Sequence, residues 1–262
     1  RDEGGVLSPI CALGRFGNRE ILGEDRIKKP MLRDASGELV ETTWAEALDV
    51  AVNGLYDVVA AKGTGAVLVS TGTGVSGEQA LALKAFADSL GAVRTGSLSV
   101  SVSRESGPGL KRVHASAGFD DLTSADAVLW LGACTPVEEP ILVARLRDAK
   151  RAGAKLVVVS EQRSRLAKTA DHWIQAPEAG VAAIAIELLG DGSAHPEAKA
   201  LLAGKWIIGL SAEGNPELSE AELDAVNAAR GEATLLLSAA SANVLGLLAA
   251  GFETPGIFAR FF

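Results

Sequence analysis

Short, continuously apolar runs alternate with longer amphipathic stretches from residue 67 onward. The runs cover residues 67–71, 128–132 and 155–160, and stretches with helical spacing cover 78–90 and 138–152. Strands without a polar face are typical of a sheet that is covered on both sides, as in parallel α/β proteins. The pattern therefore predicts an α/β fold with a parallel sheet and helices on both faces.

Two less regular stretches divide this pattern into three parts. Residues 1–42 combine Gly, Pro and charged residues with little periodicity, so we predict an irregular lead segment there. The stretch DGSAHPEA at 191–198 has the composition of a linker. We therefore predict one α/β domain over 43–190 and a second, smaller α/β unit over 191–262. The elements expected in the smaller unit are strands at 205–212 and 234–239 and a helix at 219–229.

The first clear helix is predicted to begin at Thr43. Thr43 and Glu46 have the spacing of a capping box, in which each side chain accepts a hydrogen bond from the other residue's backbone amide. Apolar residues then recur at helical spacing, at Trp44, Leu48, Val52 and Leu55. We expect this apolar face to pack against a core.

A glycine motif, GxGxxG, follows the first apolar run as Gly72, Gly74 and Gly77. A strand, these glycines and a helix are the setting of a dinucleotide pyrophosphate site. That site also needs an Asp or Glu about 20 residues later for the ribose hydroxyls, and the sequence there is AVRTGSLSV. Glu78 would stabilise the helix N-terminus and repel a phosphate. We therefore favour the first βα turn of the domain over a stand-alone dinucleotide-binding domain that uses Gly72–Gly77.

Composition and charge narrow the classes of function. The formal net charge is −8, without a stripe of Lys and Arg, which disfavours nucleic acid as a partner. The two cysteines, Cys11 and Cys134, are far apart in sequence and do not indicate a disulfide framework. No apolar run reaches the roughly 18 residues of a membrane span. Because the chain begins at Arg1 in an irregular segment, we expect it to be a fragment of a longer polypeptide.

Common catalytic and metal-binding motifs are absent from the sequence. It contains no GxSxG elbow, no GxxxxGK[ST] phosphate loop and no HExxH helix. His114, His172 and His195 lie too far apart for a local metal site. Cys11 alone cannot hold a [4Fe–4S] cluster, which needs four protein ligands. From the residues alone, Cys11 is interpreted as a free, buried cysteine.

Three segments near the start resemble the opening of the large domain in the molybdopterin oxidoreductase superfamily, which includes formate dehydrogenases. They are ICALGRFGN, DRIKKPMLR and TTWAEAL, and further similar blocks are SADAVLWLG, GAKLVVVSEQRSRLAKTADHWI and SANVLGLLAAG. The resemblance implies a Rossmann-like, doubly wound parallel sheet. It also implies that Cys11 is the fourth ligand of a [4Fe–4S] cluster and binds one of its irons, with the other ligands located before Arg1.

The sequence departs from that family where the family holds its pterin nucleotide. Cys134-Thr135-Pro136 replaces the family's Asn-Pro, and Glu139-Pro140 replaces His-Pro. A carboxylate in place of His would repel phosphates. The segment Pro177–Gly180 lacks the family's Asp, and LSVSVSRESG lacks a cysteine that could bind the metal. We therefore predict a degenerate cofactor site without molybdopterin.

One branch of the superfamily shares these departures: the large iron–sulfur subunits of bacterial NADH:quinone oxidoreductases, the respiratory complex I. TPVEEPIL and SANVLGL resemble that branch. The resemblance implies a structural, non-catalytic part of the peripheral arm on the cytoplasmic side, with the other subunits as partners and membrane association only through the complex. The alternative is a fragment of a molybdopterin enzyme such as formate dehydrogenase, in which Gly132–Pro140 and Arg163–Thr169 would contact the pterin guanine dinucleotide.

Overall fold

The computed structural model describes residues 10–17, 19, 22–72, 74–91, 94–97, 116–134, 139–211, 218, 220–238, 247 and 250–252. The chain splits into two compact units. The first comprises Arg1–Val69 and Ala85–Arg94, and the second Ser70–Lys84 and Thr95–Phe262.

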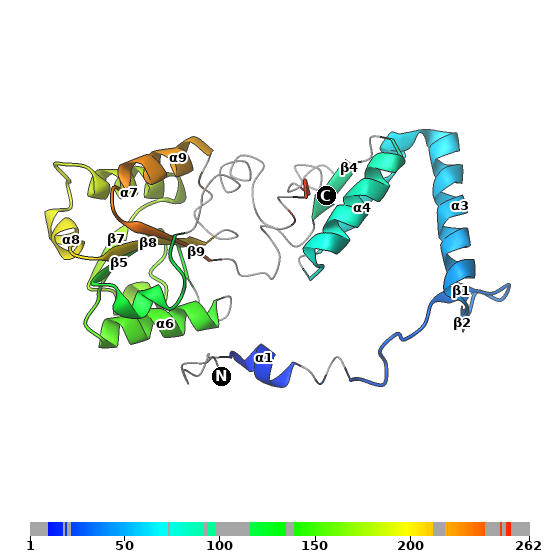
Figure 1. Ribbon diagram of the computed structural model, residues 1–262, viewed down its shortest axis with the longest axis horizontal. Helices are drawn as coiled ribbons and strands as arrows, with labels where there is room; N and C mark the ends of the chain where they lie inside the picture. Colours follow the sequence, from blue (N-terminus) through cyan, green and yellow to red (C-terminus); the bar gives the residue numbers. More distant parts are fainter. Residues whose placement is uncertain are drawn as a thin grey trace. The chain divides into compact units, whose positions relative to one another are not determined.

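The second unit is built on a five-stranded parallel sheet (Figure 1). Its strands are β5 (Ala127–Leu131), β6 (Lys155–Ser160), β7 (His172–Gln175), β8 (Trp206–Ser211) and β9 (Thr234–Ser238). The helices around it are α6 (Pro140–Arg151), α7 (Val181–Leu189), α8 (Pro196–Leu201) and α9 (Glu220–Ala229), with α6 on one side of the sheet and α7 and α9 on the other. Every residue of β5 is buried. The predicted α/β fold with a parallel, helix-covered sheet is confirmed.

The strand order is β7-β6-β5-β8-β9, so the chain first moves outward from β5 and then returns to its other side. β8 pairs directly with β5, in the register Leu129↔Ile208 and Trp130↔Gly209. The predicted separate unit over 191–262 is therefore wrong in its strands, because β8 and β9 complete the same sheet. The linker-like residues at 191–195 and α8 lie on the crossover that brings the chain back to β5.

The core of the sheet depends on a glycine beside a tryptophan. Trp130 is fully buried within a large apolar cluster. A Cβ placed on Gly209 would lie 2.4 Å from Cε3 of Trp130, which is closer than atoms can approach. Glycine in the central strand β8 therefore makes room for the indole ring.

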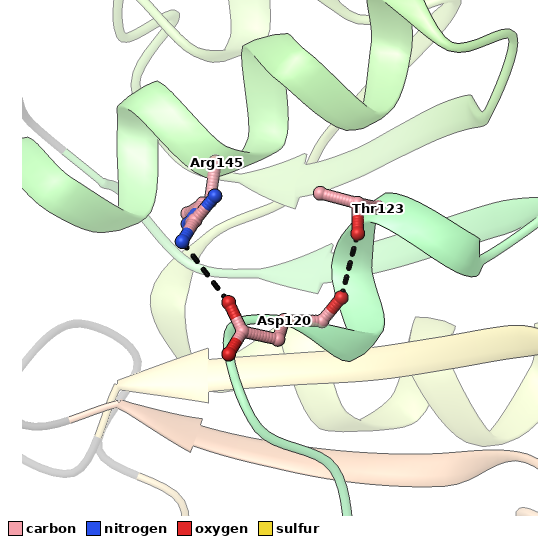
Figure 2. A network of polar contacts seen from close by, with 3 residues as sticks. All are labelled: Asp120, Thr123 and Arg145. Carbon is pink, nitrogen blue, oxygen red and sulfur yellow. Dashed lines mark hydrogen bonds and ion pairs between the residues drawn. The ribbon is translucent and has the colours of Figure 1, made fainter. Parts of the chain in front are cut away.

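Helix α6 is tied to the segment that precedes β5, through the short 3-10 helix η2 (Asp121–Ser124). Nη2 of Arg145 on α6 donates to Oδ1 of Asp120 at 3.0 Å, and the Thr123 hydroxyl donates to the Asp120 carbonyl at 2.7 Å (Figure 2). The Arg145 side chain is only 15% exposed. Asp120 thus joins α6 to the segment that leads into β5.

A short segment before β5 covers the edge strand β9. The backbone amides of Ser116 and Ala117 both donate to the Leu235 carbonyl, at 2.9 and 3.0 Å. The Leu235 amide in turn donates to the Ser116 hydroxyl at 2.9 Å. These bonds satisfy backbone groups of β9 that face away from β8.

The first unit contains one long helix and several short elements. They are α1 (Ala12–Phe16), the antiparallel strands β1 (Met31–Arg33) and β2 (Leu39–Glu41), α3 (Trp44–Lys62) and the 3-10 helix η1 (Thr64–Ala66). The predicted capping box of Thr43 and Glu46 is present. The prediction that the apolar face of this helix packs against a core is wrong, because no residue of α3 is buried and Trp44 is 70% exposed.

The glycine motif lies outside the main sheet. It connects β3 (Leu68–Thr71) to α4 (Gly77–Ser89), and β3 pairs with β4 (Arg94–Ser97) in a separate two-stranded sheet. The prediction that this motif is the first βα turn of the Rossmann-like domain is therefore wrong. The first strand of that sheet is β5, and its βα connection runs from Gly132 to Glu139.

Candidate functional site

The reversal of strand order between β5 and β8 marks the candidate site. In open α/β sheets, ligands bind beyond the carboxyl ends of the strands at such a switch point. β5 leads into Gly132, which has a positive φ of 96° that favours glycine, and then into Cys134. Glu139 follows directly before α6, with Pro140 at its first turn. The described residues that follow β5 at the switch point therefore include a glycine turn, a thiol and a carboxylate.

Cys134 and Glu139 form a buried pair at this position. Sγ of Cys134 donates to Oε2 of Glu139 at 3.3 Å. Cys134 is 1% exposed and Glu139 is 7% exposed. The other carboxylate oxygen, Oε1, is buried without a hydrogen-bond partner. The Glu139 backbone carbonyl accepts from the Val143 amide at 3.0 Å, but its side chain makes no capping bond to α6.

The charge at this position is opposite to that of a phosphate-binding site. A helix N-terminus at the switch point normally offers free amides and partial positive charge to a pyrophosphate. Here a buried carboxylate precedes the helix, and Pro140 has no amide hydrogen to offer. At an effective dielectric constant near 20, two unit negative charges about 5 Å apart repel by roughly 3 kcal/mol. Among the residues that the structure describes at this end of the sheet, Glu139 and Pro140 do not fit a pterin pyrophosphate.

The segment after β6 lies at the same end of the sheet, because β5 and β6 are parallel neighbours. The Arg163 guanidinium is 5.4 Å from the ring centroid of Trp173. Trp173 Nε1 donates to the Ser160 hydroxyl at 3.1 Å, which in turn donates to the Gln162 carbonyl at 2.9 Å. Of the two segments in the formate dehydrogenase alternative, the structure brings the described residues after β5 and the start of Arg163–Thr169 to the carboxyl end of the sheet. The second segment then leads to the opposite end, where β7 begins.

Asp171 lies at the opposite end of the sheet and has a structural role. Its carboxylate accepts from the Leu156 amide at 2.9 Å and pairs with Lys150 of α6 at 2.9 Å. Burial raises the pKa of Asp171, but these two donors outweigh it and leave the pKa below its ordinary value. The carboxylate thereby joins the start of β7 to β6 and to the last turn of α6.

Cys11 is half-buried directly before α1, where its carbonyl accepts from the Arg15 amide at 3.0 Å. Among the described residues there is no group of three or more side chains that could bind a metal together. Within that part of the chain, the structure therefore brings no set of further ligands to Cys11. Its role as a cluster ligand stays a prediction.

The N-terminus of α4, after the glycine motif, is already occupied by its own side chains. The Ser76 amide donates to Gln79 Oε1 at 2.9 Å, and the Gln79 amide donates to the Ser76 hydroxyl at 3.2 Å. Bonds from its own amide and from Ser76 hold the pKa of Glu78 below its ordinary value. A Cβ on Gly74 would meet nothing within 4 Å. These features agree with a structural rather than a phosphate-binding motif.

Sequence reasoning missed the burial of Glu139 and its bond to Cys134. Two residues five positions apart on a connecting segment carry no periodic signal that would place them together. The clue was the Pro140 that follows Glu139, since proline at a first helical position fixes where α6 begins. None of the described helices combines the length and the apolar character of a membrane span.

Comparisons with known proteins agree with this fold. The molybdopterin oxidoreductase family profile matches residues 26–195. A subunit of the NADH-quinone oxidoreductase of Streptomyces coelicolor is 34% identical over 166 residues, covering 54% of this chain and 18% of that protein. The alpha subunit of the F420-dependent formate dehydrogenase of Methanocaldococcus jannaschii is 28% identical over 173 residues, covering 63% of this chain and 24% of that protein.

Among solved structures, acetylene hydratase from Pelobacter acetylenicus has a similar fold. The TM-score is 0.52 at 18% identity, and the match covers 92% of this chain and 36% of that chain. The chain spans about a quarter or less of the length of the two relatives that it matches in sequence. Because the family profile covers well over half of its residues, the chain belongs to the molybdopterin oxidoreductase family.

Proposed function

We propose that this chain is a structural, non-catalytic part of the peripheral arm of an NADH:quinone oxidoreductase. It contributes Cys11 to a [4Fe–4S] cluster and supports the subunits through which electrons pass from NADH to quinone. Its partners are the other subunits of that arm, on the cytoplasmic side of the membrane, and it meets the membrane only through the complex. The net charge of −8 disfavours nucleic acid as a further partner.

The observation that carries this proposal is the buried carboxylate of Glu139 at the switch point. A molybdopterin enzyme must hold an anionic pterin nucleotide, and a carboxylate that is 7% exposed with one unpaired oxygen opposes a phosphate there. A parallel sheet of the family's kind, with a buried carboxylate among the described residues at its switch point, supports a loss of cofactor binding. The 34% identity to an NADH-quinone oxidoreductase subunit, within a family that also contains formate dehydrogenases, supports the same branch.

The proposed cluster role rests on the type of residue at position 11 and on its place before α1. Iron in such clusters is bound by cysteine thiolates. Cys11 is half-buried, so its thiol is accessible to a cluster that other cysteines hold. The remaining ligands would come from outside the described residues. The cluster would supply one-electron transfer, and the chain's own contribution is to hold one iron through Sγ of Cys11.

The test uses the full-length native protein, purified with its partner subunits. We expect iron and acid-labile sulfide without stoichiometric molybdenum, tungsten or pterin. Cys11→Ser should lower the iron content and remove or alter one cluster signal in electron paramagnetic resonance. Cys134→Ser is the matched control, because that thiol bonds to Glu139 and should leave the iron content unchanged. Stoichiometric molybdenum with pterin would instead favour the formate dehydrogenase alternative.

A further inference from the structure

The second oxygen of the Glu139 carboxylate has no hydrogen-bond partner, although only 7% of the residue is exposed. Nearly all buried polar groups in proteins are hydrogen-bonded, and an exception needs an explanation such as a ligand. The energetic cost of lacking a partner is largest for a charged oxygen, because burial removes the water that would otherwise solvate it. Oε2 already accepts a hydrogen bond from the Cys134 thiol, so the oxygen that lacks a donor is Oε1.

The position of this oxygen in the fold points to a ligand independently of its burial. Glu139 directly precedes α6, the helix that follows β5, and β5 is the strand at which the sheet order reverses. Ligands of open α/β sheets bind at this place. An unpaired buried acceptor and a ligand-binding position therefore coincide in one residue.

From this coincidence we infer that Glu139 binds a cationic hydrogen-bond donor, an ammonium or a guanidinium group, at the switch point. A carboxylate accepts hydrogen bonds and attracts positive charge, and bonds between two charged groups are the strongest of their kind. Phosphates and carboxylates are excluded by charge. A metal ion is disfavoured because no group of three metal-binding side chains exists among the residues that the structure describes.

Two arginines on the elements next to this site are engaged with other groups. Arg145 on α6 pairs with Asp120 at 3.0 Å (Figure 2), and Arg163 after β6 lies over the Trp173 ring. Neither arginine donates to Oε1 of Glu139, which has no hydrogen-bond partner among the described residues, so we assign the donor to a group from outside them. It is either the side chain of a partner subunit or a free small amine, and both present the same chemistry to Glu139.

This inference rests on the proposed loss of the pterin nucleotide from the switch point. The experiment measures hydrogen exchange of the amides in the first turn of α6 in the full-length protein, both as an isolated subunit and in the assembled complex. The probes are methylguanidinium, tetramethylammonium, which is charged but has no N–H donor, and inorganic pyrophosphate. Concentrations on the order of 1–10 mM suit a single charged contact.

In the isolated subunit we expect methylguanidinium to protect these amides, with tetramethylammonium and pyrophosphate at least about 10-fold weaker, as for loss of one charged hydrogen bond. Glu139→Gln should abolish the preference for methylguanidinium. Glu197→Gln is the control, because Glu197 lies next to the proline with which α8 begins, as Glu139 lies next to Pro140, but Glu197 is exposed. If Glu139→Gln does not fold, the comparison of the three probes on the unmodified protein still shows whether the site selects a cationic hydrogen-bond donor.

The comparison of the isolated subunit with the assembled complex identifies the source of the donor. Protection by methylguanidinium in the isolated subunit but not in the complex assigns it to a partner's side chain, and protection in both assigns it to a free amine. No selective protection in either arm, or equal protection by tetramethylammonium, overturns the inference. Pterin found by chemical analysis of the native protein would instead overturn the proposed function, and that result does not depend on the exchange data.

Discussion

Replacing Gly209 by alanine should test the packing on which the central sheet depends. Gly209 lies opposite Trp130 in the pairing of β8 with β5, and a Cβ there would be 2.4 Å from Cε3 and 2.5 Å from Cζ3 of the indole. Trp130 is fully buried, so its ring cannot tilt into solvent to relieve the contact. The strands or the ring must shift, and both lie in a close-packed core.

The magnitude follows from two opposing effects. Overpacking a core by one methyl group costs about 1–3 kcal/mol, and a contact at 2.4 Å puts this site at the upper end. Removing glycine from a strand returns roughly 0.5–1 kcal/mol. We therefore expect Gly209→Ala to lower the free energy of unfolding by about 2 kcal/mol, or the melting temperature by about 4–8 °C for a unit of this size.

A double-mutant cycle with Trp130→Leu separates the contact from other effects. The smaller side chain makes room for the new methyl group, so the double variant should lose about 1–2 kcal/mol less than the two single variants together. The assay is urea unfolding of the full-length protein, followed by tryptophan fluorescence and by circular dichroism.

Gly54→Ala is the control, because Gly54 lies within the exposed helix α3 and a Cβ there meets nothing within 4 Å. That variant should be as stable as the parent or about 0.5–1 kcal/mol more stable. The packing argument is refuted if Gly209→Ala unfolds at the same urea concentration as the parent, or if the effects of the Gly209 and Trp130 substitutions simply add.

Three further predictions concern other parts of the chain. Thr43→Ala removes the side-chain acceptor for the Glu46 amide and should cost α3 about 1 kcal/mol, seen as faster hydrogen exchange in its first turn. The lowered pKa of Asp171 stabilises the fold above the ordinary aspartate pKa, about 4, and this contribution is lost as the pH falls through the lower folded value. Asp171→Asn should therefore destabilise the protein in urea at pH 7 and much less near pH 2, and an equal loss at both values would contradict the assignment. Gly74→Ala should leave the melting temperature unchanged, because a Cβ there meets nothing within 4 Å. NADH should not shift the melting temperature of the parent protein or of the variant. If NADH raises the melting temperature of the parent protein but not of the variant, the dinucleotide hypothesis is restored.

The strands of the main sheet could be predicted from the sequence because their signal is local. The apolar run predicted at 155–160 is β6, and the run at 128–132 differs from β5 by one residue at each end. The division into domains failed because it depends on which strands pair. The composition of residues 191–198 indicates a loop, but it does not show that the next strand returns to β5.

The candidate site was only partly predictable. The charge of Glu139 and its departure from the family pattern are visible in the sequence, and they suggest that a phosphate is disfavoured. Its burial and its bond to Cys134 depend on how the connection after β5 folds. The glycine motif shows the opposite case: its local pattern predicts a βα turn correctly, but it does not show which sheet the strand joins, and β3 pairs with β4 outside the main sheet.

The bonds between Ser116 and Leu235 have a consequence for the order in which the sheet forms. They join residues 119 positions apart, and β5 must wait for β8, which begins at Trp206, to obtain its second neighbour. Contacts this distant in sequence are slow to form, because a long loop must close before any pairing stabilises it. During synthesis, β5, β6 and β7 can assemble first. We expect the side of β5 that later binds β8 to stay unpaired until the chain is made beyond residue 211, and this is the stage at which the protein is most open to aggregation or to capture by a chaperone.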